Sequence, residues 1–390
     1  MFQYNELFNR KNTNSLKWDH TARIFSVENA DHILPMWLAD MDIPTPSFIV
    51  DALKERLEHP IFGYTKSPQS LYDAIIKWYK ERHHWTIDRD KLLFHEGVVP
   101  SMATIIETFT KKGEKVCISP PIYGPFYSVP KNLKREVVDV PLIEEHGVYR
   151  YNFQLLEKAF QTGVKVYILS NPHNPAGVVW EKETLTTLLL LARRYNVLII
   201  SDEIHCDIVF PPNKHITLQL LNDEIGAEVV TCLSPTKTFN IASVHFSVMV
   251  ASNKALTARL KQNAMMHGRF NPNVFAMVAA ESAYTLGAKW TDGLIQHISE
   301  NMDYVINACR DIAGVRILKP QGTYLLWLDY RETNLDEKEI QKKLLLSGLG
   351  LDPGAKFGDG GDGFLRMNVA APRQTIEEAV YRLHLALDEK

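Results

Sequence analysis

Short apolar runs that alternate with helix-like segments constrain the fold of this chain more than any other feature. Five such runs lie between about Ile49 and Gly287, and their length and β-branched residues are typical of buried strands. They are Lys115–Ser119, Lys165–Ser170, Val197–Ser201, Val229–Leu233 and Phe246–Ala251. Between the second and third runs, Glu183–Tyr195 has leucines at helical spacing and ends near two arginines, as a helix does. This alternation predicts an α/β fold with a mostly parallel sheet and crossover helices.

The pattern changes after Trp290 and indicates a second, smaller unit. A long helix-like stretch leads to the apolar segment Gly322–Asp329, then to another helix and to Gly363–Val369. The 390 residues are enough for two domains. We expect a large domain over 49–288 and a small α+β domain over 289–390. Residues 1–48, with several prolines, are expected to form an N-terminal arm that belongs spatially with the small domain.

Composition excludes several classes of protein. A net charge of −3 gives no electrostatic footprint for nucleic acid or an anionic membrane surface. No apolar run approaches the roughly 20 residues of a membrane span, and the polar start does not resemble a signal peptide. The four cysteines are scattered without a CxxC pair, so neither a metal site nor a disulfide framework is expected. A cytoplasmic location fits these features.

Three of the predicted strands are followed by residues capable of chemistry. Asn171–Gly177 follows the second run, Asp202 the third, and Lys237 lies just beyond the fourth. Each alone is ordinary: an Asn-Pro turn, a helix-capping aspartate or a surface lysine. In open α/β sheets, however, functional groups gather at the carboxyl ends of the strands. A lysine at such an edge loses hydration, which lowers its pKa and makes the neutral amine available for Schiff-base chemistry.

Sequence segments spread over almost the whole chain carry a family resemblance. They are Pro35–Asp42, Phe62–Tyr64, Gly97–Pro100, Pro120–Phe126, Asn171–Gly177, Asp202–His205, Ser234–Asn240, Thr323–Asp329 and Phe364–Asn368. With these segments the chain resembles the fold-type I, pyridoxal-phosphate-dependent aminotransferase family. Pro35–Asp42 (PMWLADMD) and Asp202–His205 (DEIH) make it most similar to the MalY/PatB-like cystathionine β-lyase (C–S lyase) branch.

The resemblance implies roles around a pyridoxal phosphate ring. Lys237 would hold the cofactor covalently and later move the substrate Cα proton. Asp202 would pair with the protonated pyridine nitrogen, which keeps the ring an electron sink. Asn174 would bond to the ring 3′-oxygen, and Tyr123 would stack on the ring, although a tyrosine between prolines is also typical of a packed loop.

The phosphate would lie at the start of a helix. Gly97–Pro100 predicts a tight turn into a helix with Pro100 at its first position, where the backbone amides of Val98 and Val99 are free for an anion. The Ser234 hydroxyl would add a donor. The resemblance also implies that Tyr64 reaches the phosphate from a neighbouring subunit, which would make the protein a homodimer with shared sites. The alternative for Tyr64 is a buried core tyrosine.

Arg366 and Asn174 are the expected substrate-binding residues. An arginine in the otherwise apolar segment Phe364–Asn368 needs a partner, and in the family this position binds the substrate α-carboxylate. A structural carboxylate is the alternative partner.

Two histidines and one pair of aspartates depart from common aminotransferases or allow more than one interpretation. His245 lies eight residues after the lysine, where many aminotransferases have a phosphate-binding arginine. His205 lies where many have a tyrosine, and both a cofactor contact and a structural role are open. The Asp40–Asp42 pair is expected to line the substrate entrance rather than to bind metal, because no histidine or cysteine ligand accompanies it.

The resemblance implies β-elimination from an amino-acid thioether, such as cystathionine or another cysteine S-conjugate, to a thiol, pyruvate and ammonia. An aminotransferase acting with a 2-oxo acid would use the same residues. A regulatory protein-binding role, known for some relatives in this branch, is a third hypothesis, and no surface feature of the sequence favours it.

Overall fold

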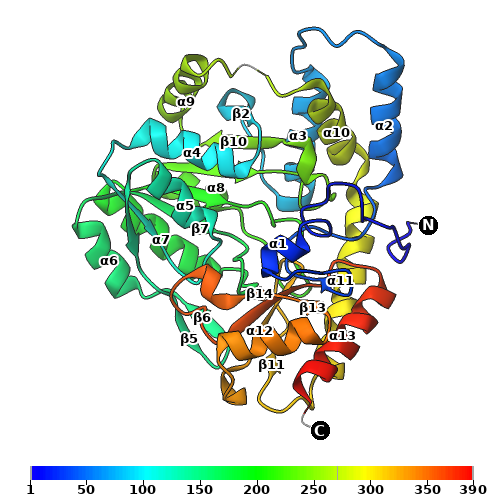
Figure 1. Cartoon of the computed structure of the whole chain (residues 1–390). Helices are drawn as coiled ribbons and strands as arrows, with labels where there is room; N and C mark the ends of the chain where they lie inside the picture. Colours follow the sequence, from blue (N-terminus) through cyan, green and yellow to red (C-terminus); the bar gives the residue numbers. More distant parts are fainter. Residues whose placement is uncertain (1, 270, 389–390) are drawn as a thin grey trace.

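A computed structural model describes residues 2–269 and 271–388 of the chain (Figure 1). The helices are α1 (Thr21–Phe25), α2 (Ser47–Glu58), α3 (Gln69–His83), α4 (Val98–Phe109), α5 (Pro125–Asn132), α6 (Phe153–Gln161), α7 (Lys182–Tyr195), α8 (Leu218–Ile225), α9 (Lys254–Met266), α10 (Val274–Leu286), α11 (Ala288–Ala308), α12 (Glu337–Leu346) and α13 (Arg373–Leu387). Among the described residues, no helix is both long enough and apolar enough to cross a membrane.

The strands fall into two main sheets and two small pairs. They are β1 (Leu34–Pro35), β2 (Leu92–His95), β3 (Lys115–Ile118), β4 (Glu136–Asp139), β5 (Ile143–Glu145), β6 (Val148–Arg150), β7 (Val164–Ser170), β8 (Leu198–Asp202), β9 (Val229–Leu233), β10 (Ser247–Ala251), β11 (Arg316–Ile317), β12 (Leu325–Asp329), β13 (Leu349–Gly350), β14 (Asp352–Pro353) and β15 (Phe364–Asn368).

The large sheet has seven strands in the order β2-β10-β9-β8-β7-β3-β4. Neighbouring strands are parallel except at β10, which runs antiparallel to both β2 and β9. The predicted α/β fold with a mostly parallel sheet is therefore confirmed. The run Val229–Leu233 forms β9 with the predicted bounds, and the other four predicted strands differ by one residue at one or both ends.

Helices cover both faces of this sheet. Successive side chains of a strand point to opposite faces, so the contacts of a single strand show which helices lie on each face. Along β7, Val166 and Ile168 pack in a cluster with residues of α4, α5 and α9. Tyr167 and Leu169 pack in a different cluster with residues of α6, α7 and α8. Both faces are thus apolar, which is why these strands form continuous hydrophobic runs in the sequence.

The C-terminal part of the chain contains an antiparallel sheet of order β11-β12-β15-β14, with α12 and α13 beside it (Figure 1). β1 of the N-terminal segment pairs in parallel with β13, so that Leu34 lies beside Leu349. This pairing is consistent with an arm that associates with the C-terminal part. The domain limits at residues 48 and 288 stay predictions.

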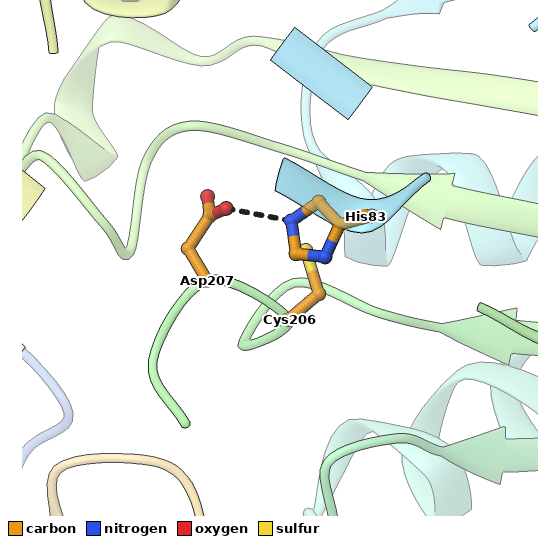
Figure 2. Close-up of side chains that lie close together, drawn as sticks. All are labelled: His83, Cys206 and Asp207. Atoms are coloured by element: carbon orange, nitrogen blue, oxygen red, sulfur yellow. Dashed lines mark hydrogen bonds and ion pairs between the residues drawn. The ribbon is translucent and has the colours of Figure 1, made fainter. Parts of the chain in front are cut away.

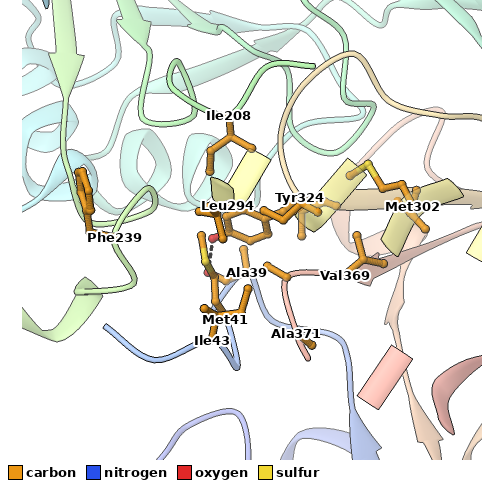
Figure 3. Packing of buried hydrophobic residues seen from close by; sticks show 14 of the residues in the cluster. Ala39, Met41, Ile43, Ile208, Phe239, Leu294, Met302, Tyr324, Val369 and Ala371 are labelled. Atoms are coloured by element: carbon orange, nitrogen blue, oxygen red, sulfur yellow. Dashed lines mark hydrogen bonds between the residues drawn. The ribbon is translucent and has the colours of Figure 1, made fainter. Parts of the chain in front are cut away.

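The segment that follows β1 is buried between the large sheet and the C-terminal part. Figure 3 shows Ala39, Met41 and Ile43 among side chains that include Phe239 and Val369. Met41 and Ile43 are almost completely inaccessible to solvent. This part of the N-terminal segment, which includes Met36, Ala39, Met41 and Ile43, therefore belongs to the hydrophobic core.

Candidate active site

The three predicted strand ends meet at one edge of the large sheet. In the parallel register of β7, β8 and β9, Ser170 lies beside Asp202, and Asp202 lies beside Cys232. The backbone continues this alignment, because Asn171 N donates to the Asp202 carbonyl oxygen at 2.9 Å. Asp202 ends β8, and Lys237 follows β9 at the same edge. The structure therefore brings the predicted carboxylate and lysine to one place.

Lys237 is partly buried, and its amine donates a hydrogen bond to the carbonyl oxygen of Ala39. Burial lowers the pKa of Lys237 to about 8, Asp40 and Asp202 act in the opposite direction, and Arg366 lowers the pKa further. A sizeable fraction of the amine is therefore neutral near physiological pH, as a nucleophile or proton acceptor requires.

Asp202 is buried and lacks a direct cationic partner among the described residues. Its Oδ1 accepts from Ile204 N at 3.1 Å. Burial raises the pKa of Asp202 to about 7; the bond from Ile204 N and the Lys237 charge oppose this effect, and Glu203 adds to it. A buried carboxyl group without a cationic partner would be stabilised in its ionised form by a bound cation that carries an N–H group. The protonated pyridine nitrogen of the expected cofactor is such a cation.

Arg366 enters the same site from β15, where it is almost fully buried. Its Nη1 donates to Asn174 Oδ1 at 3.0 Å, and its Nη2 donates to Asp352 Oδ2 at 2.9 Å and to the Trp37 carbonyl at 3.2 Å. Among the described residues, Nε has no hydrogen-bond partner although it is buried. The structural carboxylate considered for this arginine therefore exists, and one nitrogen of the guanidinium stays available for a ligand.

Asn174 and Tyr123 lie beside these charged groups. The amide oxygen of Asn174 is occupied by Arg366, so its NH₂ group is the part that would donate to a cofactor oxygen. Burial raises the pKa of Tyr123, and the charges of Arg366, Asp202 and Asp352 act on its hydroxyl. Tyr123 is thus close to the site, as expected, and its stacking on a cofactor ring stays a prediction.

The start of α4 forms a candidate anion site. The helix begins at Val98, and Gly97 precedes it with a φ of 139°, a conformation that favours glycine. No side chain caps this end, so the amides of the first turn, including those of Val98 and Val99, are free for a ligand. The prediction that Pro100 occupies the first helical position is wrong by two residues. Proline is tolerated there because amides of the first turn need no intrahelical acceptor.

Ser234 and Tyr64 are placed differently from the other predicted phosphate ligands. Ser234 Oγ donates to the Phe246 carbonyl at 2.7 Å and accepts from Thr236 N at 3.1 Å, so its hydroxyl would have to rotate to reach a phosphate. Thr236 Oγ1, which lies 2.7 Å from Ser234 Oγ, is a neighbouring donor that the sequence did not single out. Tyr64 is fully exposed between α2 and α3, so the buried-core alternative is wrong for the single chain.

Three further groups of the site, the Ala39 carbonyl, Tyr324 and His205, have no role assigned by the sequence. The Ala39 carbonyl accepts from both the Lys237 amine and the Tyr324 hydroxyl, the latter at 3.2 Å. His205 packs edge-on against Tyr324 with ring centres 5.6 Å apart, and burial lowers its pKa to about 3, with Lys237 and Arg366 contributing. His205 therefore lies in the site as a neutral imidazole. A backbone carbonyl leaves no signal in side-chain patterns, and Tyr324 resembled an ordinary strand residue.

A buried cluster of His83, Cys206 and Asp207 supports the lysine loop (Figure 2). Asp207 Oδ1 accepts from Trp78 Nε1 at 3.1 Å and bonds with His83 Nε2 at 2.8 Å, while Oδ2 accepts from Thr238 Oγ1 at 2.9 Å. Burial raises the pKa of the Cys206 thiol well above its ordinary value. Because the carboxylate is already bonded and the thiol stays protonated, the cluster holds the residue after the lysine and is not suited to a metal ion.

Comparison with known proteins gives a consistent result. The model of the family "Aminotransferase class I and II" matches residues 38–383. The chain is 38% identical over 381 residues to cystathionine beta-lyase PatB of Bacillus subtilis, covering 97% of this chain and 98% of that protein. It is similar to cystalysin of Treponema denticola with pyridoxal 5′-phosphate (TM-score 0.95, 32% identity, 99% and 98% covered). It is also similar to the cofactor-bound C–S lyase of Staphylococcus hominis (TM-score 0.91, 30% identity, 100% and 99% covered).

Proposed function

Because the chain belongs to the aminotransferase class I and II family, we propose that it is a pyridoxal-phosphate-dependent C–S β-lyase. It would cleave cystathionine or another cysteine S-conjugate to a thiol, pyruvate and ammonia. The observation that carries the proposal is the buried grouping of the Lys237 amine, the Asp202 carboxyl and the Arg366 guanidinium at one sheet edge. Two of the relatives described above, PatB and the Staphylococcus hominis protein, are named lyases, which favours β-elimination over amino transfer.

The residues present fit the cofactor. Asp202 supplies a buried carboxyl for the pyridine nitrogen, and the uncapped start of α4 supplies amides for the phosphate. Asn174 and Tyr123 would hold the ring, and Ser234 would assist the phosphate. When bound, pyridoxal phosphate supplies an electron sink for the negative charge left when the substrate Cα loses its proton.

The proton is moved by Lys237. Since burial lowers the pKa of this amine to about 8, the neutral form can accept the Cα proton and the protonated form can return it. Arg366, with Asn174 beside it, would bind the substrate α-carboxylate through the guanidinium nitrogen that has no protein partner. Binding of the carboxylate fixes which substituent of Cα faces the lysine.

The leaving group determines the reaction class. A thiol has a pKa of about 8.5 and leaves far more readily than a hydroxyl, so a thioether at Cβ is the suitable substrate feature. The Cβ–S bond breaks with its electron pair going to sulfur, and the released 2-aminoacrylate hydrolyses to pyruvate and ammonia.

We also propose that the protein acts as a homodimer in the cytoplasm. Exposed apolar and aromatic residues on α2, on α9 and in the α2–α3 connection would be covered by a second copy; they include Leu57, Ile61, Phe62, Tyr64, Met265 and Met266. Tyr64 would then reach the phosphate of the partner's site. All four cysteines are free and buried, as suits a reducing compartment.

The proposal is tested with purified protein, pyridoxal phosphate and L-cystathionine in the absence of a 2-oxo acid. Pyruvate and thiol are expected in equal amounts, and neither is expected from Lys237→Ala. Amino transfer that needs a 2-oxo acid and releases no thiol would instead identify an aminotransferase. If the cofactor-loaded protein turned over neither cystathionine nor a panel of cysteine S-conjugates, the lyase proposal would be rejected.

A further inference from the structure

Residues 37–42 are here called the 37–42 segment, and the carbonyl oxygens of its first four residues accept hydrogen bonds from side chains at the active site. Arg366 Nη2 donates to the Trp37 carbonyl at 3.2 Å, and Lys237 donates to that of Ala39. Asn368 Nδ2 donates to the carbonyls of Leu38 and Asp40 at 2.8 Å each. The position of this backbone therefore fixes where the Lys237 amine and the Arg366 guanidinium lie.

The other side of the 37–42 segment is held by Arg10. Its Nη2 lies 2.6 Å from Asp40 Oδ2, and its Nη1 lies 2.8 Å from Asp42 Oδ1 and 2.9 Å from the Met41 carbonyl. Burial works against the charge of Arg10, but Asp40 and Asp42 outweigh it and raise the pKa of Arg10. The guanidinium thus bridges two carboxylates and a carbonyl within three successive residues.

Lys17 and Trp18 fix the end of the same segment. The fully buried Lys17 amine lies 2.7 Å from Asp42 Oδ2 and donates to the Asp40 carbonyl at 2.9 Å. Trp18 Nε1 donates to Asp42 Oδ1 at 2.8 Å. The expectation that Asp40 and Asp42 line the substrate entrance is therefore wrong for Asp42, which is an internal ion-pair partner. Of these two carboxylates, it is Asp40 whose charge acts on the pKa of Lys237.

We propose that Arg10 is a positioning residue for Lys237: it holds Asp40 so that the Ala39 carbonyl is fixed as the acceptor of the lysine amine, and it balances the Asp40 charge beside that amine. The catalytic meaning of this arrangement rests on the proposed function. The arrangement itself involves only Lys237, the 37–42 segment and Arg10. It can therefore be tested without measuring catalytic turnover.

The charges around Lys237 give the sign of the expected effect. Asp40 and Asp202 raise the pKa of the amine and Arg366 lowers it, whereas the nearby His205 is neutral and adds no charge. Removing the Arg10 charge would leave Asp40 unbalanced, which would raise the pKa of Lys237 and reduce the neutral fraction at pH 7. The Ala39 carbonyl stabilises the protonated amine, so its displacement would act in the opposite direction and reduce the size of this upward shift.

The test measures covalent attachment of pyridoxal phosphate to the cofactor-free protein by absorbance, as a function of pH. Only the neutral amine condenses with the aldehyde, releasing water, so the midpoint of the rate profile reports the pKa of Lys237. Arg10→Met is expected to move the midpoint upward by about 0.5 to 1 pH unit, which slows attachment at pH 7 roughly three- to tenfold. Asp40→Asn is expected to move it downward.

Two further variants distinguish an effect of the Arg10 charge on the pKa of Lys237 from a general loss of structure caused by the substitution. Arg10→Lys restores the charge without the fork and is expected to recover at least half of the shift. Lys11→Met is the matched control, because Lys11 is adjacent, cationic and exposed and contacts Asp31 rather than the 37–42 segment. It is expected to leave the midpoint unchanged.

The outcomes are distinguishable. An Arg10→Met protein with a lower melting temperature but an unchanged midpoint would show a purely structural role and overturn the proposal. If Arg10→Met does not fold, Asp40→Asn decides: a downward shift supports the proposal and an unchanged midpoint rejects it. Failure of the lyase proposal would appear separately, as wild-type protein that attaches the cofactor normally but releases no thiol.

Discussion

Arg366 and Asp352 face each other across the β14–β15 pair, and Arg366 Nη2 donates to Asp352 Oδ2 at 2.9 Å. Both side chains are buried, and the other oxygen of Asp352 accepts from Lys356 Nζ at 3.1 Å. The guanidinium is therefore held by a protein carboxylate from one side, while its Nε stays free. This explains how a cation can stay in the core when no substrate is bound.

Asp352→Asn is expected to weaken substrate binding more than turnover. Loss of the buried carboxylate removes the partner that orients the guanidinium, and we expect KM for an amino-acid substrate to rise about tenfold, or roughly 1.4 kcal/mol. Because breaking a buried ion pair leaves an uncompensated charge, the free energy of unfolding should fall by about 3 kcal/mol. Steady-state kinetics and urea unfolding check both. Lys356→Met, which removes only the exposed partner of Asp352, should cost less than about 1 kcal/mol.

Asp202→Asn is expected to have opposite effects on the cofactor-free and cofactor-loaded proteins. Burial raises the pKa of Asp202 to about 7, so the carboxyl group ionises less readily in the folded protein than in the unfolded chain. The free energy of unfolding of the cofactor-free protein therefore falls as pH rises from about 4, and the decrease is complete above pH 7. Without cofactor at pH 8, the variant should therefore melt at a higher temperature than the wild type. With pyridoxal phosphate it should gain less stability, because the amide does not neutralise the pyridine cation. Scanning calorimetry with and without cofactor checks this reversal, and equal cofactor stabilisation of both proteins would contradict it.

Stability should fall on acidification because of buried ion pairs. Burial opposes ionisation of Asp42, but Lys17, Trp18 and Arg10 outweigh it and lower its pKa. Its contribution is therefore present above about pH 4 and is lost as pH falls through the lowered value. Asp42→Asn should lower the free energy of unfolding by about 3–5 kcal/mol at pH 7, and this difference should shrink progressively as pH falls below about 4. Asp31→Asn, at an exposed carboxylate, is the control and should not change the free energy of unfolding measurably.

Mixed dimers test whether Tyr64 serves the neighbouring site. Tyr64→Ala and Lys237→Ala are each expected to lose most activity as homodimers. In a mixed dimer, one site would combine an intact lysine from one subunit with an intact tyrosine from the other. Random reassociation at equal ratio should then restore about a quarter of wild-type activity, since half of the dimers carry one intact site. No recovery, with mixed dimers verified by mass spectrometry, would exclude the shared site.

Much of the fold was predictable from the sequence because the buried parallel strands carry apolar residues on both faces. Val229–Leu233 shows this best, since its predicted and observed bounds coincide. The predicted helix Glu183–Tyr195 begins one residue later than α7. The start of α4 was placed two residues late, because Gly97 and not Pro100 sets the change in backbone direction.

The site was predictable only where function depends on side chains at strand ends. Asp202 and Lys237 followed from their positions after β8 and β9. The role of the Ala39 carbonyl did not, since a main-chain oxygen has no residue-specific signal. The partner of Arg366 was also out of reach, because Asp352 belongs to a two-residue strand that no periodicity indicates. Contacts between distant segments, such as Arg10 with Asp40, need the tertiary structure.

The contact between the N-terminal 37–42 segment and the C-terminal strand β15 has a consequence for biosynthesis. Asn368 Nδ2, which bonds to the Leu38 carbonyl, lies 330 residues away from it in sequence. At a translation rate of about 5–20 residues per second, the 37–42 segment leaves the ribosome roughly 15–65 s before its partners on β15 exist. A nascent chain must keep this segment from aggregating for that time. A chain truncated before β15 would have neither the acceptor position for its lysine nor the arginine for its substrate, so activity should appear only with full-length product.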